Sequence, residues 1–174
     1  MSQGKMFVEA LLNWKAPTAP APVAVPADVA VRRADIFKKQ CGDFDIEAAI
    51  YDKDRYSCVI AELKISAAVQ RIPSERFSEL VERFVERVDY LPERLALVEL
   101  DRQSGSAQIR SKQPLLTENA REFFEIRLTD RHDFSLRRFR KPDGEAARQP
   151  REMVITFDIC ERLIDDIAAL WQAE

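Results

Sequence analysis

The densest set of side chains that could carry chemistry lies between Arg121 and Arg151, where eight arginines and one lysine stand against six acidic residues. The segment 134–141 within it alternates as a β-strand does, which places successive side chains on opposite faces. One face then presents Phe139 between Arg137 and Lys141. A planar ring beside cations can stack a nucleobase while the cations contact phosphates, a combination typical of single-strand nucleic-acid binding.

The complete candidate set for nucleic-acid binding takes in the neighbouring basic residues and consists of Arg137, Arg138, Phe139, Arg140, Lys141 and Arg151. By contrast, the segment from Glu152 to Glu174 holds one arginine and six acidic residues, so a basic strand is followed by an acidic segment. The alternative interpretation of the strand is a solvated sheet edge whose charges protect it against aggregation.

A second candidate site is Glu62-Leu63-Lys64, which has the Glu-x-Lys form of the PD-(D/E)xK nucleases and resembles them in that short pattern. Glu62 and Lys64 are two residues apart on a predicted strand and therefore share a face. There a carboxylate could hold Mg²⁺ while the ammonium group stabilises the attacking water or the developing phosphate charge. Asp52 or Asp54 would have to supply a further carboxylate. The alternative is the solvated face of an ordinary strand.

Other catalytic classes lack the residues that they need. His132 is the single histidine, which excludes multi-histidine metal sites, and it is expected in a solvated turn. The four glycines are too scattered to form a phosphate-binding loop. Cys41, Cys58 and Cys160 are widely spaced and are expected to be buried thiols in a reducing cytoplasm. We therefore predict a protein that is not an enzyme and needs no metal or cofactor.

The first 15 residues are predicted to form a short amphipathic arm. Phe7, Leu11 and Trp14 recur at i, i+4 and i+7, which places them on one face of a helix. That face could pack on the chain's own globular part, or it could bind a groove on a partner or on a second copy of the chain. Residues 16–29 contain four prolines and no glycine, which predicts an extended and stiff linker. The globular region is then expected over residues 30–174.

Within that region the apolar pattern predicts two hairpins and two principal amphipathic helices. The hairpins are expected over residues 44–65 and 95–110, because apolar alternation flanks a short polar break in each. One helix is expected over residues 73–90, and a second begins with Asp158 as its N-cap and runs to the end of the chain. A further short helix is expected from Arg32 to Gln40, ended by Gly42.

The two parts of the globular region have a similar order of elements. Residues 44–90 and 122–172 both run from a hairpin through a short apolar segment to a capped helix. This order favours a tandem ββ(β)α repeat with halves over residues 30–114 and 117–174. The fold class is therefore predicted as α+β with antiparallel sheets.

The C-terminal third resembles a known type of single-strand-binding protein. Ser135-Leu-Arg-Arg-Phe-Arg-Lys, the Pro142-Asp-Gly-Glu turn, Met153-Val-Ile-Thr-Phe-Asp and the Glu161-Arg-Leu-Ile-Asp-Asp-Ile helix look like the positive-cofactor-four type of transcriptional coactivator and the related purine-rich-element-binding repeats. The resemblance implies a curved antiparallel sheet with a dimerising helix that binds single-stranded DNA without a cofactor. The segment Gln149-Pro-Arg-Glu is less basic than the corresponding strand of that family.

The leading functional prediction is therefore a non-enzymatic module that binds single-stranded nucleic acid and forms a homodimer in the cytoplasm. The formal net charge of −3 excludes a strongly basic coat but allows a local basic patch. No apolar run is long enough to span a membrane. A protein-interaction adaptor or secretion-chaperone-like dimer is the second alternative, and the Mg²⁺-dependent nuclease is the third.

Overall fold

The computed structural model of the chain describes residues 1–17, 33–68 and 70–172, and it has one antiparallel sheet of long and short strands with helices beside it. The helices are α1 (Gln3–Asn13), α2 (Ser74–Arg87) and α3 (Phe157–Gln172). The strands are β1 (Asp35–Cys41), β2 (Phe44–Lys53), β3 (Ser57–Ala67), β4 (Leu95–Asp101), β5 (Ser106–Ser111), β6 (Leu115–Thr117), β7 (Ala120–Thr129), β8 (Asp133–Pro142), β9 (Gln149–Arg151) and β10 (Met153–Thr156).

The main path of the sheet runs β1-β2-β3-β8-β7-β5-β4, so strands from distant parts of the chain meet at its centre. There Glu62–Ser66 of β3 pairs with Asp133–Arg137 of β8. Beyond this pairing the segment 149–156 bridges the two strands, because β9 pairs with β8 and β10 pairs with β3. The central strands are therefore buried on the side that faces the helices, and their alternation decides which side chains face away.

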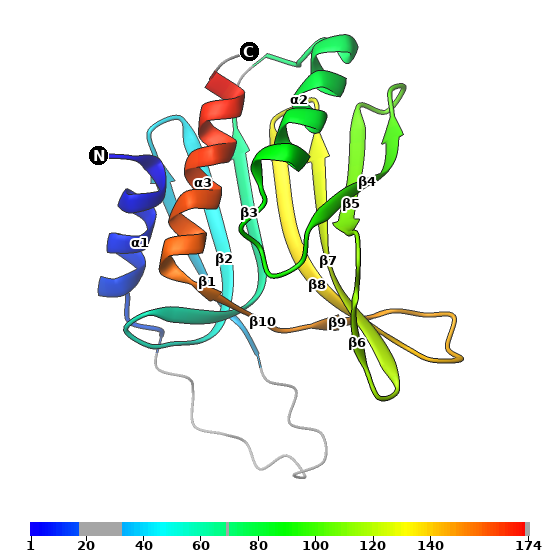
Figure 1. Cartoon of the computed structure of the whole chain (residues 1–174). Coiled ribbons are helices and arrows are strands. Elements are labelled where there is room, and N and C mark those ends of the chain that lie inside the picture. Colours follow the sequence, from blue (N-terminus) through cyan, green and yellow to red (C-terminus); the bar gives the residue numbers. More distant parts are fainter. Residues whose placement is uncertain (18–32, 69, 173–174) are drawn as a thin grey trace.

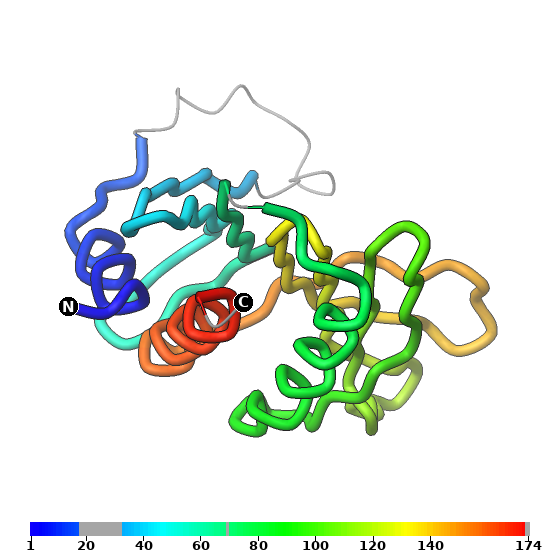
Figure 2. The backbone as a smooth tube through the Cα atoms, turned by 90° about the horizontal axis from the view of Figure 1, so that it is seen from above, coloured from blue at the N-terminus to red at the C-terminus, as the bar shows by residue number. Residues whose placement is uncertain are grey.

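All three helices lie on the same face of the sheet. Figures 1 and 2 show α1 and α3 over β1–β3, and α2 over the strands that follow it in the chain. The apolar stripe of α2 supplies Phe84, whose ring meets the edge of Phe134 on β8 with centroids 6.1 Å apart. Trp171 of α3 stacks on Phe44 of β2. No described helix or strand covers the opposite face, which we call the open face.

The predicted fold class, α+β with an antiparallel sheet, is confirmed, and both predicted hairpins are present as β2–β3 and β4–β5. The described residues contain three helices rather than two principal ones. The tandem repeat is not confirmed, since β4 and β5 follow α2 in the first half, whereas in the second half all strands precede α3. No described helix is long and apolar enough to cross a membrane.

A helix is predicted from Arg32 to Gln40, but the described residues from Asp35 on form the edge strand β1. Phe37 and Cys41 are its buried residues, and they are four positions apart. A spacing of four suits one face of a helix and one face of a strand equally well, so the short pattern did not decide. The segment becomes a strand because it pairs with β2 through the two-residue turn at Gly42, where φ is 60°.

The N-terminal arm packs on its own chain as α1. Phe7 and Leu11 are fully buried, and Phe7 and Trp14 both contact the ring of Phe37 on β1. Lys53 at the end of β2 donates through Nζ to the carbonyl oxygens of Leu11 and Leu12 at 2.7 and 2.8 Å. The arm thus belongs to the core of the same chain and does not form a free partner-binding face. Most of the predicted linker, residues 18–29, lies outside the described residues.

Three local predictions have different outcomes. The N-cap of α3 is Thr156 rather than Asp158, because Thr156 Oγ1 accepts from the Ile159 N–H at 3.4 Å. His132 does lie in the turn between β7 and β8, but it is buried, has a φ of 61° and contacts the ring of Trp171 edge-on. The three cysteines are buried free thiols as predicted, and burial raises the pKa of Cys58 to about 12.

Candidate functional site

The strand registers define which side chains lie on the open face. Leu63 and Leu136 face the helices across the β3–β8 pair, so the alternating positions Glu62 and Arg137 face away. The same alternation rule, applied to β3, β5, β7 and β8, identifies the charged side chains of the open face; one more, Arg148, comes from the loop between β8 and β9. The basic ones are Lys64, Arg110, Arg121, Arg127, Arg137, Lys141 and Arg148, and the acidic ones are Glu62, Glu125 and Asp133.

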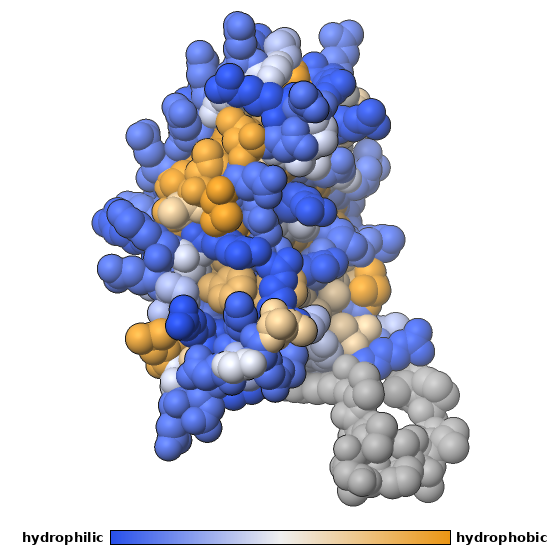
Figure 3. All heavy atoms as spheres, turned by 90° about the vertical axis from the view of Figure 1, so that its right-hand side faces the viewer, coloured by the Kyte–Doolittle hydropathy of each residue, from blue (hydrophilic) through white to orange (hydrophobic). Residues whose placement is uncertain are grey.

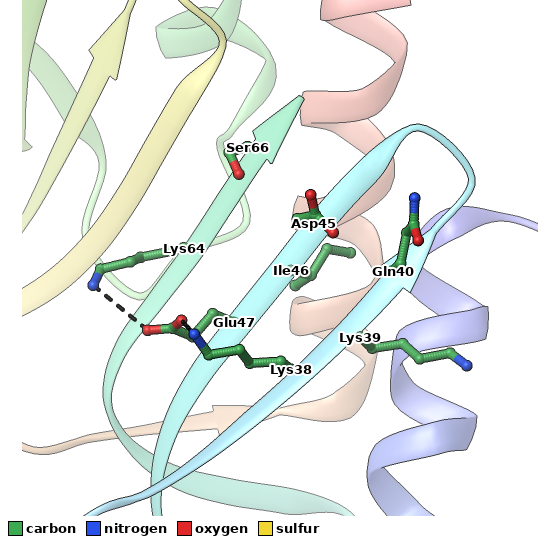
Figure 4. A pocket seen from close by; sticks show the side chains of 8 residues that line it. All are labelled: Lys38, Lys39, Gln40, Asp45, Ile46, Glu47, Lys64 and Ser66. Atoms are coloured by element: carbon green, nitrogen blue, oxygen red, sulfur yellow. Dashed lines mark ion pairs between the residues drawn. The ribbon is translucent and has the colours of Figure 1, made fainter. Parts of the chain in front are cut away.

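A row of alternating charges crosses the strands of this face. Lys38 of β1 lies 2.7 Å from Glu47 of β2, and Lys64 of β3 lies 3.6 Å from the other oxygen of the same carboxylate, as Figure 4 shows. Lys64 also lies 3.3 Å from Glu62, which accepts from Nε of Arg137 on β8 at 2.7 Å. The hydrogen bond from Lys38 lowers the pKa of Glu47, and the bond with Glu62 raises the pKa of Arg137. The row therefore joins four strands through ion pairs and retains an excess of cations.

A second cluster on the open face surrounds Glu125 of β7. One of its oxygens accepts from Gln108 at 2.8 Å and from Arg110 Nε at 2.7 Å, and Arg148 donates to the same oxygen. Burial works to raise the pKa of Glu125, but the hydrogen bonds from Arg148 and Arg110 outweigh it and leave the pKa below its usual range. Two arginines thus share one carboxylate, which leaves the cluster with net positive charge.

We predict that Glu125→Gln lowers stability in a pH-dependent way. Because the pKa of Glu125 is lowered in the folded protein, the ionised carboxylate stabilises the fold fully above its ordinary value of 4.5 and loses that contribution as pH falls through the lowered pKa. At neutral pH the free energy of unfolding of the wild type should exceed that of the variant, and the difference should shrink as the pH falls below 4.5 and through the lowered pKa of Glu125. Urea unfolding of both proteins across this range checks the prediction. If the difference in free energy of unfolding between the two proteins stays constant with pH, the charge of Glu125 is not the source of the stabilisation.

Two shallow pockets join on the open face to form a polar groove across the strands. The first, of about 380 Å³, is lined by Lys38, Gln40, Asp45, Glu47, Lys64 and Ser66 among others (Figure 4). The second, of about 330 Å³, includes Lys64 and Ser66 again and continues over Arg137, Ser135 and Arg127. We call the combined depression the polar groove. Its lining combines hydroxyl groups and five cations with the four carboxylates of Asp45, Glu47, Glu62 and Asp133, so the groove suits polar rather than apolar ligands and keeps a small excess of positive charge.

Three of the six predicted nucleic-acid-binding residues lie on the open face. Arg137 lines the polar groove, and Lys141 is exposed opposite Arg121. Phe139 also points to this face, but its ring stacks on Phe123 at 6.1 Å and is covered by Arg148, whose guanidinium carbon lies 4.1 Å from the ring centroid. The ring is therefore buried, and a base could stack on it only after Arg148 moves.

The other three predicted residues, Arg138, Arg140 and Arg151, lie on the opposite side of the strand, as its alternation requires. Arg138 is 10% exposed and is held by Glu93 at 2.9 Å and Glu122 at 3.4 Å, with its guanidinium over Phe124. Arg151 lies 3.6 Å from the same Glu122. The candidate surface therefore does not include these three arginines.

The described residues do not assemble the predicted nuclease site. Glu62 and Lys64 share the open face as expected, but both are engaged in the row of ion pairs. Asp52 pairs with Val59, three residues before Glu62, which puts it about 10 Å away along the strand. Asp54 accepts from the N–H groups of Tyr56 and Ser57 in its own turn. No group of three His, Cys, Asp or Glu side chains that could hold a metal occurs in the described part of the chain.

Several members of the open face are missing from the set predicted from the sequence. Lys38 lies on a strand whose pattern predicts a helix, and the predicted set does not include Arg110, Arg127 and Arg148. The sequence feature that could have identified Arg110 and Arg127 is the alternation along residues 106–111 and 121–129, because it places charged and apolar side chains on opposite faces of each strand. It does not indicate which strands become neighbours.

Comparison with known proteins finds no relative of this chain. No protein-family model, no curated protein and no solved structure matches the chain. The resemblance to single-strand-binding proteins therefore rests on the sequence motifs of the C-terminal third.

Proposed function

We propose that the open face binds the phosphate backbone of single-stranded nucleic acid, without a metal or cofactor. The observation that carries this proposal is the excess of basic over acidic side chains on the central strands of an uncovered sheet face. Strand alternation turns these side chains toward solvent together, and the polar groove crosses the middle of the set. An extended polyanion laid on the face would meet cations from successive strands.

The charge of the rest of the molecule supports the same orientation. The whole chain carries a formal net charge of −3, so a basic face requires an acidic surface elsewhere. Glu75, Glu79, Glu82 and Glu86 of α2 lie on the side of the helices and are all exposed, against three arginines of the same helix. A polyanion is repelled from that side and attracted to the open face, which gives binding a direction.

The geometry favours phosphate contacts over base stacking. Phe123 and Phe139 are the aromatic rings of the open face on β7 and β8, and both are buried beneath arginines, Arg110 and Arg148. The arginines cover these rings on the solvent side. Binding is therefore expected to tolerate any base sequence and to depend strongly on salt.

The test is a fluorescence-anisotropy titration of a labelled oligonucleotide of about 20 nucleotides at low and moderate salt. The variant Lys64→Gln/Arg127→Gln/Arg137→Gln removes three cations of the polar groove. For single strands the loss of three phosphate contacts should reduce the magnitude of the salt slope by about 2 and weaken binding at low salt by about tenfold or more.

A matched control removes the same charge from the other side of the molecule. Lys5→Gln/Lys15→Gln/Arg83→Gln changes three exposed residues on or beside α1 and α2. It should leave both affinity and salt slope close to wild type. Equal losses in the two triple variants, or binding that does not respond to salt, would contradict the proposed face.

A further inference from the structure

The two edges of the sheet differ in how they are protected. Edge β1 carries Lys38 and Lys39, both exposed, and lysine on an edge strand discourages pairing with another chain. Edge β4 pairs only with β5 along the main path and has no basic residue between Leu95 and Asp101. Its side chains Leu97 and Val98 are 39% and 53% exposed. Figure 3 faces this side of the molecule and shows hydrophobic residues gathered on it.

From these features we infer that β4 pairs antiparallel with β4 of a second copy of this chain. An edge strand presents unpaired N–H and C=O groups that can form a ladder with another strand. The exposed leucine and valine add an apolar contact that a protected edge would lack. Since the same strand is offered by both copies, the contact is isologous and closes as a dimer.

Charge complementarity selects both the partner and the register. Arg94 precedes β4 and Asp101 ends it, so an antiparallel copy brings opposite charges together at both ends. In the register that places Arg94 opposite Asp101, Leu97 lies opposite Val98 of the second copy. A shift by one residue places Arg94 opposite Arg102, which like-charge repulsion disfavours. Hydrogen bonds from Ser104 and Gln103 hold the pKa of Asp101 below its usual range, so its charge is present at neutral pH.

A β-bulge explains why the two apolar residues are exposed together. Leu97 pairs with Ile109 and Glu99 pairs with Gln108, which leaves Val98 as the extra residue. The bulge disrupts the ladder toward β5 locally and leaves Val98 without a partner residue on that strand. Leu97 and Val98 thereby form the centre of the offered edge, on either side of the two-fold axis.

The dimer would also extend the proposed binding face, and this consequence rests on the proposed function. Antiparallel pairing of two identical edge strands in one sheet requires a two-fold axis perpendicular to the sheet. Both open faces then lie on the same side, and the helices of both copies lie on the other. A nucleic-acid strand long enough to cross β4 would contact both copies and gain affinity through effective concentration.

The first experiment measures the mass of the full chain in solution by sedimentation at protein concentrations from about 1 to 100 µM, because a single-strand edge interface is small and reversible. The measured mass of the wild-type protein should rise with concentration toward twice the 20.0 kDa of one chain. Val98→Lys should remain a monomer. Val154→Lys is the matched control, since Val154 is 67% exposed on β10, and it should dimerise like wild type. A monomeric wild type, or a dimer that persists in Val98→Lys, would overturn the inference.

The second experiment tests the register through disulfide formation. Leu97→Cys and Val98→Cys are made as separate single variants, and the natural cysteines do not interfere because all three are buried. Residues directly opposite on antiparallel strands are about 5 Å apart between Cα atoms, which a disulfide can span. A cross-linked dimer should form under oxidation in the mixture of the two variants and not in either one alone. Absence of the mixed cross-link, or equal cross-linking of each variant by itself, would overturn the pairing.

Neither experiment contains nucleic acid, so the two proposals can fail separately. A monomer that still binds the oligonucleotide overturns the β4 dimer and leaves the open face in place. A dimer with the predicted cross-link that does not bind overturns the proposed function and leaves the dimer in place. A β4 edge occupied by another protein's extended segment, with no self-association, also overturns the inference.

Discussion

Gly4→Ala is expected to destabilise the folded protein by about 2–4 kcal/mol, although alanine normally favours a helix. Gly4 lies in α1, and an added Cβ would overlap the backbone carbonyl of Glu161 on α3. The Gly4 N–H also donates to Asp165 Oδ1 at 2.7 Å, which holds the two helices together. If α1 leaves α3, the fully buried Phe7 and Leu11 lose their apolar surroundings. Urea unfolding followed by circular dichroism measures the change in free energy.

The control for Gly4→Ala is Lys5→Ala, which replaces the next, exposed residue of the same helix. Its effect should stay within about 0.5 kcal/mol, because it changes helix propensity but no contact with α3. A stabilising effect of Gly4→Ala would show that α1 can move away from α3 without loss. The close approach at Gly4 would then not contribute to the fold.

The second large effect is expected at Arg138→Met, with a loss of about 3 kcal/mol. Arg138 is 10% exposed and lies between Glu93 and Glu122, which are also mostly buried. Removing the cation leaves two carboxylates near each other, with Ser111 Oγ donating to Glu93 at 2.6 Å as a remaining partner. Methionine keeps the apolar contact with Phe124 but cannot neutralise either charge. Urea unfolding at neutral pH checks the value.

The neighbouring residue provides a matched control with the opposite expectation. Arg137 is on the same strand, its side chain is 51% exposed, and it faces the open side. Arg137→Met should change the free energy of unfolding by less than about 1 kcal/mol, because an exposed ion pair contributes little. It should weaken oligonucleotide binding, whereas Arg138→Met should weaken binding only as far as it unfolds the protein. A similar loss of stability in both variants would contradict the separation of the two faces.

Elements with long and periodic patterns can be predicted from the sequence alone. The apolar stripe of α2 and the alternation of β2 and β3 extend over enough residues to exclude the other period. Alternation along β8 likewise suffices to separate Arg137, Phe139 and Lys141 from Arg138 and Arg140. Both faces of that strand follow from local geometry, since neighbouring side chains of a strand must point in opposite directions.

What those faces contact depends on the tertiary structure. The seven residues of β1 fit a helix or a strand, and the pairing with β2 selects the strand. The amphipathic arm requires an apolar surface, and α3 and Phe37 supply it from the same chain. His132 is buried because Trp171 from the far end of the chain packs against it.

The strand that carries the basic and aromatic residues shows this division most clearly. Its alternation is enough to predict that two sets of arginines face opposite ways. The sheet order places β3 on one side of it and β7 on the other, which joins Lys64, Arg127 and Arg137 into one groove and encloses Arg138 between Glu93 and Glu122. The direction of a side chain follows from the local backbone, but its environment depends on residues distant in the chain, and no local pattern records which of these will be neighbours.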